Sequence, residues 1–181
     1  IEPLPNGNIL VLAWERKTAN EAFGIGRETI DNPLNEMWSE AILELELVGS
    51  NDANIVWEWH LWDHLIQDID PELPNYGVVA DHPELQDINY GNVGSMSDPL
   101  GPNGDWKHLN SIDYNEDLDQ IIISSRHHDE IYIIDHSTTT EEAASSSGGN
   151  SGKGGNYLYR WGNPQTYGRG DELNHLLSVQ H

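Results

Sequence analysis

Cysteine is absent from this chain of 181 residues, which excludes disulfide bonds and thiolate chemistry. Basic residues are scarce as well, because 8 Lys and Arg stand against 31 Asp and Glu and leave a formal net charge of −23. A surface this acidic repels the phosphate backbone, so nucleic acid is excluded as the main partner. No segment approaches the roughly 18 to 20 apolar residues that cross a bilayer. We therefore expect no membrane span.

Aromatic residues with a polar group are abundant, with seven Trp and seven Tyr against a single Phe. Such rings suit strands that border a surface or a cleft, since each ring offers an apolar body and a hydrogen-bonding end. Hydrophobic residues make up 36% of the chain, and its length fits about one domain. The composition therefore predicts a domain with a hydrophobic core under a heavily hydrated acidic surface.

Short segments of β-branched, aromatic or alternating residues recur along the chain, separated by loops rich in Gly, Pro, Asn and Asp. Segments with this pattern are typical of β-strands. They fall into two sets that are separated by a long loop. The first set covers residues 8–14, 41–47 and 55–62, and the second covers residues 108–114, 120–126, 130–135 and 157–161.

The two sets repeat one pattern, which indicates a unit of four antiparallel strands. Such units in series predict an all-β fold, a β-propeller segment of about two four-stranded antiparallel blades plus the start of a third, with long loops. The blade over residues 1–62 lacks its inner strand, which we expect before Ile1 because the hairpin turn Pro5–Asn8 comes first. A closed ring needs about four to eight blades, so we expect a piece of a longer protein.

Loops make up much of the remaining chain. Residues 63–105 form a long Pro-rich insertion with little regular structure, and loops of this kind often cover a site. Residues 106–162 form the complete blade. Its Ser/Gly-rich loop, residues 137–156, is expected to be mobile with little apolar anchoring. Residues 163–181 lead into the next blade.

His108 and Arg126 are the candidate site pair. If the hairpin between their strands turns near Asp117, the two residues lie equally far from the turn and face each other across an antiparallel pair. The inner strand of a propeller blade lines the central channel, so this end of the hairpin can present both groups to a ligand. Imidazole and guanidinium together suit sulfate, phosphate or carboxylate. The spacing also fits a structural role, in which Arg126 neutralises carboxylates and His108 caps the hairpin.

The other histidines have no spacing that predicts a site. His60 and His64 would match a metal pair on a helix, but an extended strand separates them by roughly 13 Å, so we interpret them as structural or as part of an interface. The stretch Asp113–Asp119 begins like a calcium loop, but Leu118 replaces the required Gly. We therefore predict no metal site. The remaining histidines are expected in solvent or loops: His82, His127, His128, His136 and His175.

Several longer motifs occur in order along the chain. They are LPNGN from Leu4, DWKHLNS over Asp105–Ser111, SSR ending at Arg126, IID ending at Asp135, YRWGNP over Tyr159–Pro164, and the terminal Gln180–His181. Together they resemble the bacterial arylsulfate sulfotransferases. These enzymes are periplasmic or secreted propellers that move a sulfuryl group between phenols without the nucleotide sulfate donor. The resemblance therefore implies the same fold, location and reaction for this chain, with no cofactor.

The resemblance also implies roles for individual residues. His108, in the WxHxN segment, and Arg126 resemble the sulfuryl-binding histidine and arginine of the family, and Asn110 accompanies them in substrate binding. His181 resembles the histidine nucleophile, which carries the sulfuryl group as a covalent intermediate and gives ping-pong transfer. A further active-site histidine of the family lies just upstream of a Pro-Asn-Gly hairpin, a position that precedes Ile1.

The implied partners are a phenolic sulfate donor, a phenol acceptor and the rest of the chain's own propeller, with a homo-oligomer also open. Two other functions stay open at this point. One is a non-catalytic β-propeller module that binds a partner or a polysaccharide, with His108 and Arg126 in its rim. The other is a propeller hydrolase or quinoprotein-like enzyme, whose calcium carboxylates or repeated Trp motifs we do not find. Convergence of His108, Arg126 and His181 on one cavity would favour the transferase.

Overall fold

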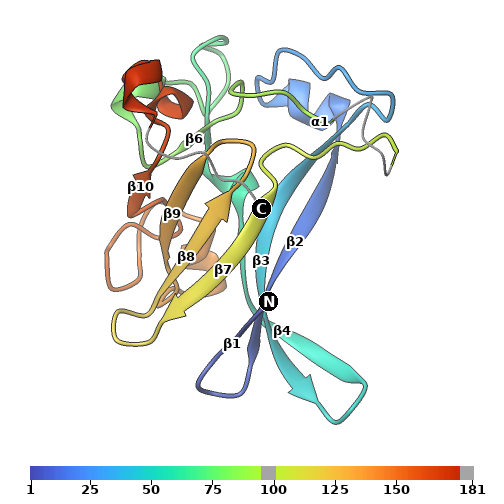
Figure 1. The fold of residues 1–181 in the computed structure, drawn as a ribbon, viewed down its shortest axis with the longest axis vertical. Helices are drawn as coiled ribbons and strands as arrows, with labels where there is room; N and C mark the ends of the chain where they lie inside the picture. Colours follow the sequence, from blue (N-terminus) through green and yellow to red (C-terminus); the bar gives the residue numbers. More distant parts are fainter. Residues whose placement is uncertain (95–100, 176–181) are drawn as a thin grey trace.

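Two four-stranded antiparallel sheets form most of the fold, with strand orders β1-β2-β3-β4 and β10-β9-β8-β7 (Figure 1). The computed structural model describes residues 1–94 and 101–175. The predicted all-β class is confirmed. The first sheet contains β1 (Glu2–Pro3), β2 (Ile9–Thr18), β3 (Glu36–Val48) and β4 (Asp52–His60). The second sheet contains β7 (Leu109–Asn115), β8 (Gln120–Ser125), β9 (Glu130–Asp135) and β10 (Tyr159–Trp161).

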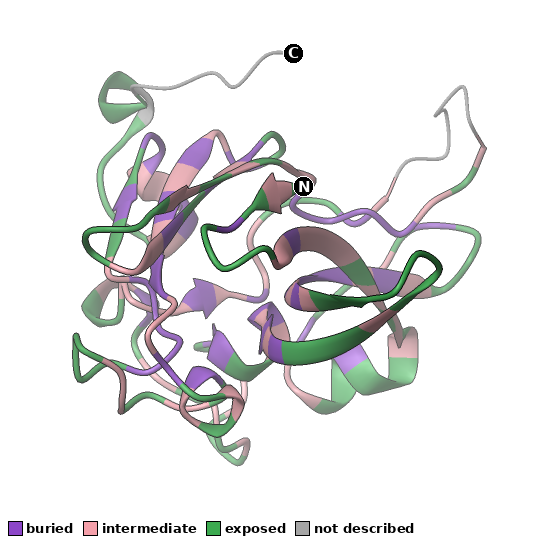
Figure 2. Ribbon diagram, turned by 90° about the horizontal axis from the view of Figure 1, so that it is seen from below, coloured by how far each residue is buried: buried purple, intermediate pink, exposed green. Residues whose placement is uncertain are grey.

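Alternating burial explains how the strands pack. On β8, Ile121 and Ile123 are buried, whereas Ile122 between them points outward and is 38% exposed. Because successive side chains of a strand point to opposite faces, one face of this sheet turns to the core. Leu10 and Ile42 of the first sheet belong to the same hydrophobic cluster as the isoleucines of the second. A single core therefore joins the two sheets, and Figure 2 marks buried segments on both.

The first hairpin differs from the sequence-based expectation in one respect. The turn itself is confirmed, because the amide of Leu4 donates to the carbonyl oxygen of Asn8 over 2.8 Å and Gly7 has a φ of 92°. Glycine adopts such angles without strain. We expected the strand before the turn to precede Ile1. Glu2–Pro3 forms this strand instead, as β1, and pairs with β2. The two residues directly before the turn are extended enough to start the ladder.

Two short helices were not expected from the strand pattern. They are α1 (Ala19–Gly24), which follows β2, and α2 (Thr140–Ala143), which follows β9. Each begins with a capping box, in which the side chain of a Thr accepts from the backbone amide of a Glu and the side chain of that Glu accepts from the backbone amide of the Thr. The pairs are Thr18 with Glu21 and Thr139 with Glu142. These reciprocal bonds satisfy amides that the first turn of a helix leaves unpaired.

The Ser/Gly-rich loop 137–156 is anchored to the first sheet, so the expectation of little apolar anchoring is wrong. Ala143 is fully buried in the core cluster. Nε1 of Trp59 donates to the carbonyl oxygen of Gly155 over 2.8 Å, and His64 contacts the carbonyl oxygen of Ala143, also at 2.8 Å. A Cβ atom at Gly155 would lie 2.0 Å from that same carbonyl oxygen. The loop therefore packs through glycine backbone, which its composition does not reveal.

The Pro-rich insertion contains only short elements in its described part. They are the 3-10 helices η1 (Leu61–His64) and η2 (Val79–Asp81) and the parallel two-residue strands β5 (Leu65–Ile66) and β6 (Gln86–Asp87). Arg160 of β10 donates to the carbonyl oxygens of Pro83 and Leu85 over 3.2 and 3.0 Å, which ties the insertion to the second sheet. The amide of Gly94 donates to the carbonyl oxygen of Asp105 over 2.6 Å. The insertion therefore reaches the start of β7.

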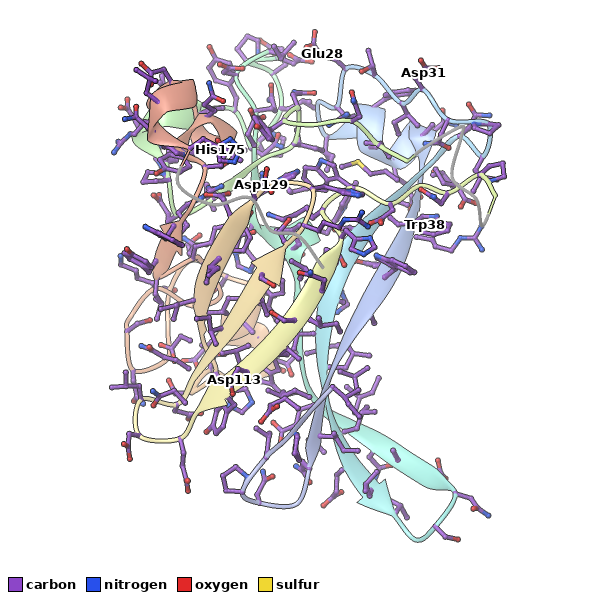
Figure 3. The ribbon with its side chains drawn as sticks, viewed as in Figure 1. Glu28, Asp31, Trp38, Asp113, Asp129 and His175 are labelled. Atoms are coloured by element: carbon purple, nitrogen blue, oxygen red, sulfur yellow. The ribbon has the colours of Figure 1, made fainter. Side chains whose placement is uncertain are left out.

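The last described segment contains the 3-10 helices η3 (Pro164–Tyr167) and η4 (Glu172–Asn174). His175 follows them in a loop and forms an ion pair with Asp129, with Nε2 and Oδ2 3.1 Å apart (Figure 3). Residues 176–181, the end of the segment predicted to lead into the next blade, lie outside the described residues, and His181 is among them. No helix in the described part of the chain is long and apolar enough to cross a membrane.

Candidate functional site

The open end of the β7–β8 hairpin brings His108 and Arg126 together. The amide of Arg126 donates to the carbonyl oxygen of His108 over 3.1 Å, so the predicted pairing of these residues is confirmed. The guanidinium of Arg126 is exposed. Backbone pairing therefore fixes the distance between the two Cα atoms, while the side chain of Arg126 can turn toward a ligand.

A bulge decides which residue stands opposite His108. If the register that pairs Asn115 with Gln120 near the turn continued unchanged, His127 would stand opposite His108. The ladder instead shifts by one residue between Leu109 and Ser111, which brings Arg126 to that position. Bulges re-aim side chains and are common beside functional sites. The shift also leaves His127 just beyond the pair, where its amide donates to the carbonyl oxygen of Lys107 over 3.1 Å.

A pocket of about 340 Å³ opens at this end of the hairpin. Its walls come from the insertion, from the segment before β7 and from the residues that follow β8. The described residues that line it are Asn92, Gly94, Asn103, Asp105, His108, Arg126 and His127. Among these described residues, two imidazoles, a guanidinium and one carboxylate face the cavity.

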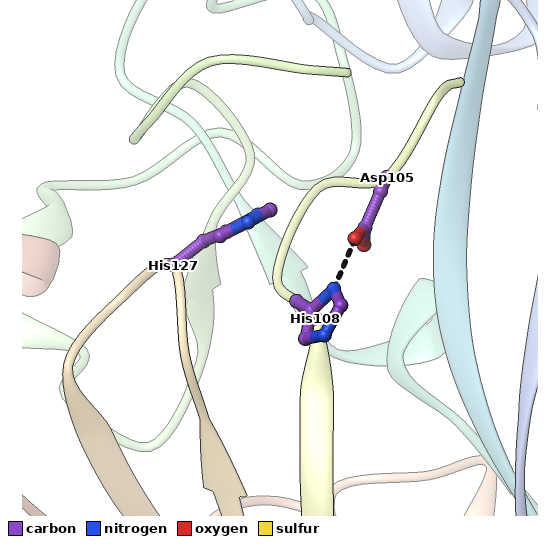
Figure 4. Close-up of side chains that lie close together, drawn as sticks. All are labelled: Asp105, His108 and His127. Atoms are coloured by element: carbon purple, nitrogen blue, oxygen red, sulfur yellow. Dashed lines mark hydrogen bonds and ion pairs between the residues drawn. The ribbon is translucent and has the colours of Figure 1, made fainter. Parts of the chain in front are cut away.

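Asp105 accepts a hydrogen bond from Nδ1 of His108 inside this pocket (Figure 4). The side chain of Asp105 is 9% exposed, and that of His108 is 29% exposed. Oδ2 of Asp105 takes the bond, whereas Oδ1 is buried and has no hydrogen-bond partner in residues 1–94 and 101–175. Trp38 of β3 forms a β-bridge with Asp105, which holds its backbone in place.

Backbone conformation aims the two imidazoles. His108 has a φ of 54°, in the left-handed region that few residues other than glycine adopt. Strain of this kind is concentrated at functional sites, where the surrounding contacts enforce it. The ring of His127 lies 5.1 Å from that of His108, centroid to centroid, and its Nδ1 is 3.2 Å from the carbonyl oxygen of Trp106. Because a carbonyl only accepts, Nδ1 of His127 carries the proton and Nε2 carries the lone pair.

Glu40 of β3 lies beneath the start of β7. Its Oε1 accepts from the amide of Leu109 over 3.3 Å, and the residue is 2% exposed. Burial raises the pKa of Glu40 to about 8; the hydrogen bond from Leu109 opposes this rise, and the charge of Asp105 adds to it. The carboxyl group is therefore largely protonated at neutral pH, which avoids a second buried negative charge beside Asp105.

Comparison with protein families identifies the chain. The model of the arylsulfotransferase (ASST) family matches residues 1–142. The chain belongs to this family. The resemblance seen in the sequence motifs is thereby confirmed. The matched range contains the whole described wall of the pocket and ends before His181. Comparisons with curated proteins and with solved structures each found no match.

The two other predicted site residues, Asn110 and His181, are not among the described residues that line the pocket. Asn110, on β7, accepts from the hydroxyl of Ser124 over 2.7 Å and is not one of the described residues that line the pocket. His181 lies outside the described residues. Of the three side chains predicted to converge, His108 and Arg126 line one cavity, and the place of His181 stays a prediction.

The sequence interpretation missed two residues that line the arylsulfotransferase pocket, Asp105 and His127. Both lie just beyond the ends of strands, where alternation no longer predicts the direction of a side chain. A signal was available for each. Asp105 precedes His108 by three residues in the DWKH motif, and His127 directly follows Arg126.

His128 and His136 lie in loops, as expected, but both make specific contacts that the sequence did not predict. His128 is fully buried rather than in solvent, and its ring packs edge-on against Tyr90 at 5.1 Å. Burial, with the nearby charge of Lys107, holds the pKa of His128 well below its ordinary value. His136 bridges Glu44 of β3 and Asp119, with contacts of 3.0 and 2.8 Å. It therefore joins the two sheets away from the pocket.

Proposed function

We propose that this chain carries the sulfuryl-binding part of an arylsulfate sulfotransferase, which moves a sulfuryl group from a phenolic sulfate ester to another phenol. One observation carries the proposal: in a member of the arylsulfotransferase family, His108 and Arg126 line a single pocket. A cation and hydrogen-bond donors around one cavity suit a tetrahedral anion.

Arg126 and His108 hold the sulfuryl oxygens in this proposal. Charge spreads over the equatorial oxygens as the group is transferred, so fixed donors stabilise the transition state more than the ground state. Asp105 accepts from Nδ1 of His108, and we assign Nε2 to the ligand. When the imidazole is protonated, Asp105 balances its charge and Nε2–H donates to a sulfuryl oxygen.

An aromatic shelf beside His108 supports an aryl substrate. Trp14 of β2 is 51% exposed, and its ring lies 6.4 Å from that of His108 and 5.3 Å from that of Trp38. An exposed indole stacks well on a phenyl ring. We propose that the aromatic rings of the sulfate donor and of the phenol acceptor stack on the indole of Trp14.

The transfer itself takes two displacements. A neutral nitrogen of His181 attacks the sulfur in line, the bond between sulfur and the aryl oxygen breaks, and the phenolate leaves with that electron pair. The oxygen of a second phenol then attacks the sulfohistidine, its proton is released, and the bond between nitrogen and sulfur breaks to regenerate His181. The family resemblance alone assigns His181 to this step. Such a covalent intermediate gives ping-pong kinetics.

The proposed setting follows from the same resemblance. We propose that the two sheets are neighbouring blades of a β-propeller, completed by further blades of a longer chain, in the periplasm or outside the cell. The four-stranded antiparallel order of both sheets supports this arrangement. Contacts of β7 with β1 and β2 bring edges of the two sheets together, which supports this arrangement.

The test is transfer from p-nitrophenyl sulfate to phenol by the purified protein, without nucleotide. Release of nitrophenol and formation of phenyl sulfate are measured together, and binding of p-nitrophenyl sulfate is measured by calorimetry. The proposal expects transfer, and binding that is lost in His108→Ala and Arg126→Ala. Transfer of labelled sulfuryl to His181, found by peptide mapping, would support the covalent step.

The outcomes separate the candidate functions. Binding without transfer in the full-length protein would favour the non-catalytic module. Release of nitrophenol without phenyl sulfate would favour a hydrolase. Binding that survives replacement of both His108 and Arg126 would remove the proposed sulfuryl site.

A further inference from the structure

We propose that Asp105, His108 and His127 bind a divalent transition-metal ion such as Zn²⁺. Each residue offers one ligand atom, and the three atoms lie within 4.8 Å of one another (Figure 4). Two imidazole nitrogens with one carboxylate oxygen form a ligand set that suits Zn²⁺ and its neighbours in the first transition row. Ca²⁺ and Mg²⁺ prefer oxygen ligands throughout, so the cluster discriminates against them.

The carboxylate of Asp105 points independently to a missing cation. Its side chain is about nine-tenths buried, and Oδ1 has no hydrogen-bond partner within the described ranges 1–94 and 101–175. A buried carboxylate oxygen without a donor is costly, and native structures rarely leave one. A metal ion bound to Asp105 would neutralise the charge and satisfy this oxygen. The net charge of −23 also raises the local concentration of cations.

One of the two imidazoles, that of His127, is held by a backbone oxygen atom of the protein. Nδ1 of His127 contacts the carbonyl oxygen of Trp106 at 3.2 Å, which leaves the lone pair on Nε2. A backbone carbonyl or a carboxylate on one ring nitrogen is the usual support for a metal-binding histidine, since it fixes both tautomer and orientation. Asp105 is already hydrogen-bonded to His108, so a metal ion placed between them would replace the proton that they share.

The required movement is small. Bonds of about 2.0 to 2.1 Å place tetrahedral ligand atoms about 3.4 Å apart, so separations of up to 4.8 Å must shorten by roughly 1.4 Å. A tilt of the exposed His127 ring about its contact with the carbonyl oxygen of Trp106 supplies this change. The open side of the pocket leaves a coordination position for water. Arg126 lines the same pocket and opposes the ion by its charge, but its exposed side chain can turn away into solvent.

Zn²⁺ binding to the chelator-treated protein tests the proposal. Calorimetry in the presence of excess Mg²⁺ should show one tight site, which Asp105→Asn and His127→Gln each weaken by roughly tenfold or more. His82→Gln is the matched control, because His82 pairs with Glu84 at 2.9 Å on the exposed surface. It should leave the affinity within about twofold. Circular dichroism checks that each variant is folded, and His127→Gln covers the case in which Asp105→Asn does not fold.

Co²⁺ gives a second readout. Co²⁺ in a site with few ligands absorbs visible light more strongly than hydrated Co²⁺, and the band should appear with the wild type and be lost with His127→Gln. Equal Zn²⁺ affinity in wild type and His127→Gln would overturn the proposal. Complete displacement of Zn²⁺ by Mg²⁺ would overturn it as well. Either result would mean that Zn²⁺ binds to scattered surface carboxylates. These readouts do not involve sulfuryl transfer, so the metal site and the proposed function can fail separately.

Discussion

Nδ1 of His108 donates to Oδ2 of Asp105, a residue only three positions earlier in the chain. The left-handed backbone at His108, with a φ of 54°, turns the imidazole back toward that carboxylate. The same turn leaves the ring open to the pocket shared with Arg126. A local backbone feature therefore sets both the partner of His108 and the direction in which it meets a ligand.

Replacing Asp105 by Asn tests whether this contact positions His108 for transfer. The amide keeps the shape but removes the charge that balances a protonated imidazole. We expect kcat/KM for p-nitrophenyl sulfate to fall on the order of 10- to 100-fold. The pH dependence of kcat/KM should change shape as well, because the charge partner of a titrating group is lost.

Glu84→Gln is the control for Asp105→Asn, since it removes a carboxylate from another histidine, His82, on the exposed surface. It should leave the rate and its pH dependence unchanged. A purely structural role for Asp105 predicts a lower Tm with an unaltered pH profile, and this result would exclude the positioning role.

Arg126→Ala should lower turnover by roughly 100- to 1000-fold, because it removes a fixed donor from the transition state. Stability should hardly change, since the side chain is exposed. Initial rates of nitrophenol release and urea unfolding measure the two effects. Arg169→Ala removes an exposed arginine whose Nε donates to the carbonyl oxygen of Ala80, and it should retain the rate. A stability loss in Arg126→Ala with full turnover would assign Arg126 a structural role.

Trp14→Ala tests the aryl shelf beside His108. We expect KM for p-nitrophenyl sulfate to rise by about 2- to 12-fold, in line with the ~0.5 to 1.5 kcal/mol that an aromatic pair contributes beyond its buried area. Inorganic sulfate, which has no ring, should bind Trp14→Ala and wild type equally. Trp161→Ala, which removes a 40% exposed indole from β10, serves as the control. If both tryptophan variants raise KM alike, the ring of the substrate does not rest on Trp14.

The strands were largely predictable from the sequence because alternation of side chains reports the face of a sheet directly. The pairing of His108 with Arg126 was predicted as well, but from the assumption that the hairpin turns near Asp117 and continues without a bulge. In the structure the two residues stand opposite each other only because the register shifts between Leu109 and Ser111. Alternation carries no signal for an inserted residue, so the bulge could not be foreseen.

The remainder of the site depends on loop backbone, and this limits prediction. Asp105 and His127 lie where no repeat constrains the direction of a side chain. Their approach follows from the φ of His108 and from the bridge to Trp38, which links segments far apart in the sequence. The anchoring of the Ser/Gly-rich loop was missed for a related reason, because the carbonyl oxygen of Gly155, not a side chain, accepts from Trp59.

Glu40→Gln should change how stability depends on pH. In the unfolded chain this carboxyl group ionises near its ordinary pKa of 4.5, whereas burial raises the folded pKa to about 8. Between these values the unfolded state binds fewer protons than the folded state, so stability falls as the pH rises. Glutamine cannot ionise, so the variant should lose this part of the decline and exceed the wild type above pH 8.

Urea unfolding from pH 4.5 to pH 9 in the presence of a chelator measures the effect of Glu40→Gln. The two stability curves should diverge by on the order of a few kcal/mol toward the alkaline end. Glu46→Gln, an exposed glutamate on the same strand, is the control and should follow the wild type. Parallel curves for Glu40→Gln and wild type would show that Glu40 is already ionised in the folded protein.

Arg160→Met should destabilise the protein by about 3 to 5 kcal/mol, because it leaves the carboxylate of Glu130 buried without its counter-charge. Glu130 is fully buried, and Arg160 donates to it twice, from Nε over 3.0 Å and from a terminal nitrogen over 2.6 Å. The double variant with Glu130→Gln separates the causes, since a neutral amide removes the unpaired charge. It should recover a substantial part of the loss in urea unfolding, giving a coupling energy of roughly 0.5 to 3 kcal/mol. If the double variant is as unstable as Arg160→Met, the loss comes instead from the bonds of Arg160 to the insertion at Pro83 and Leu85.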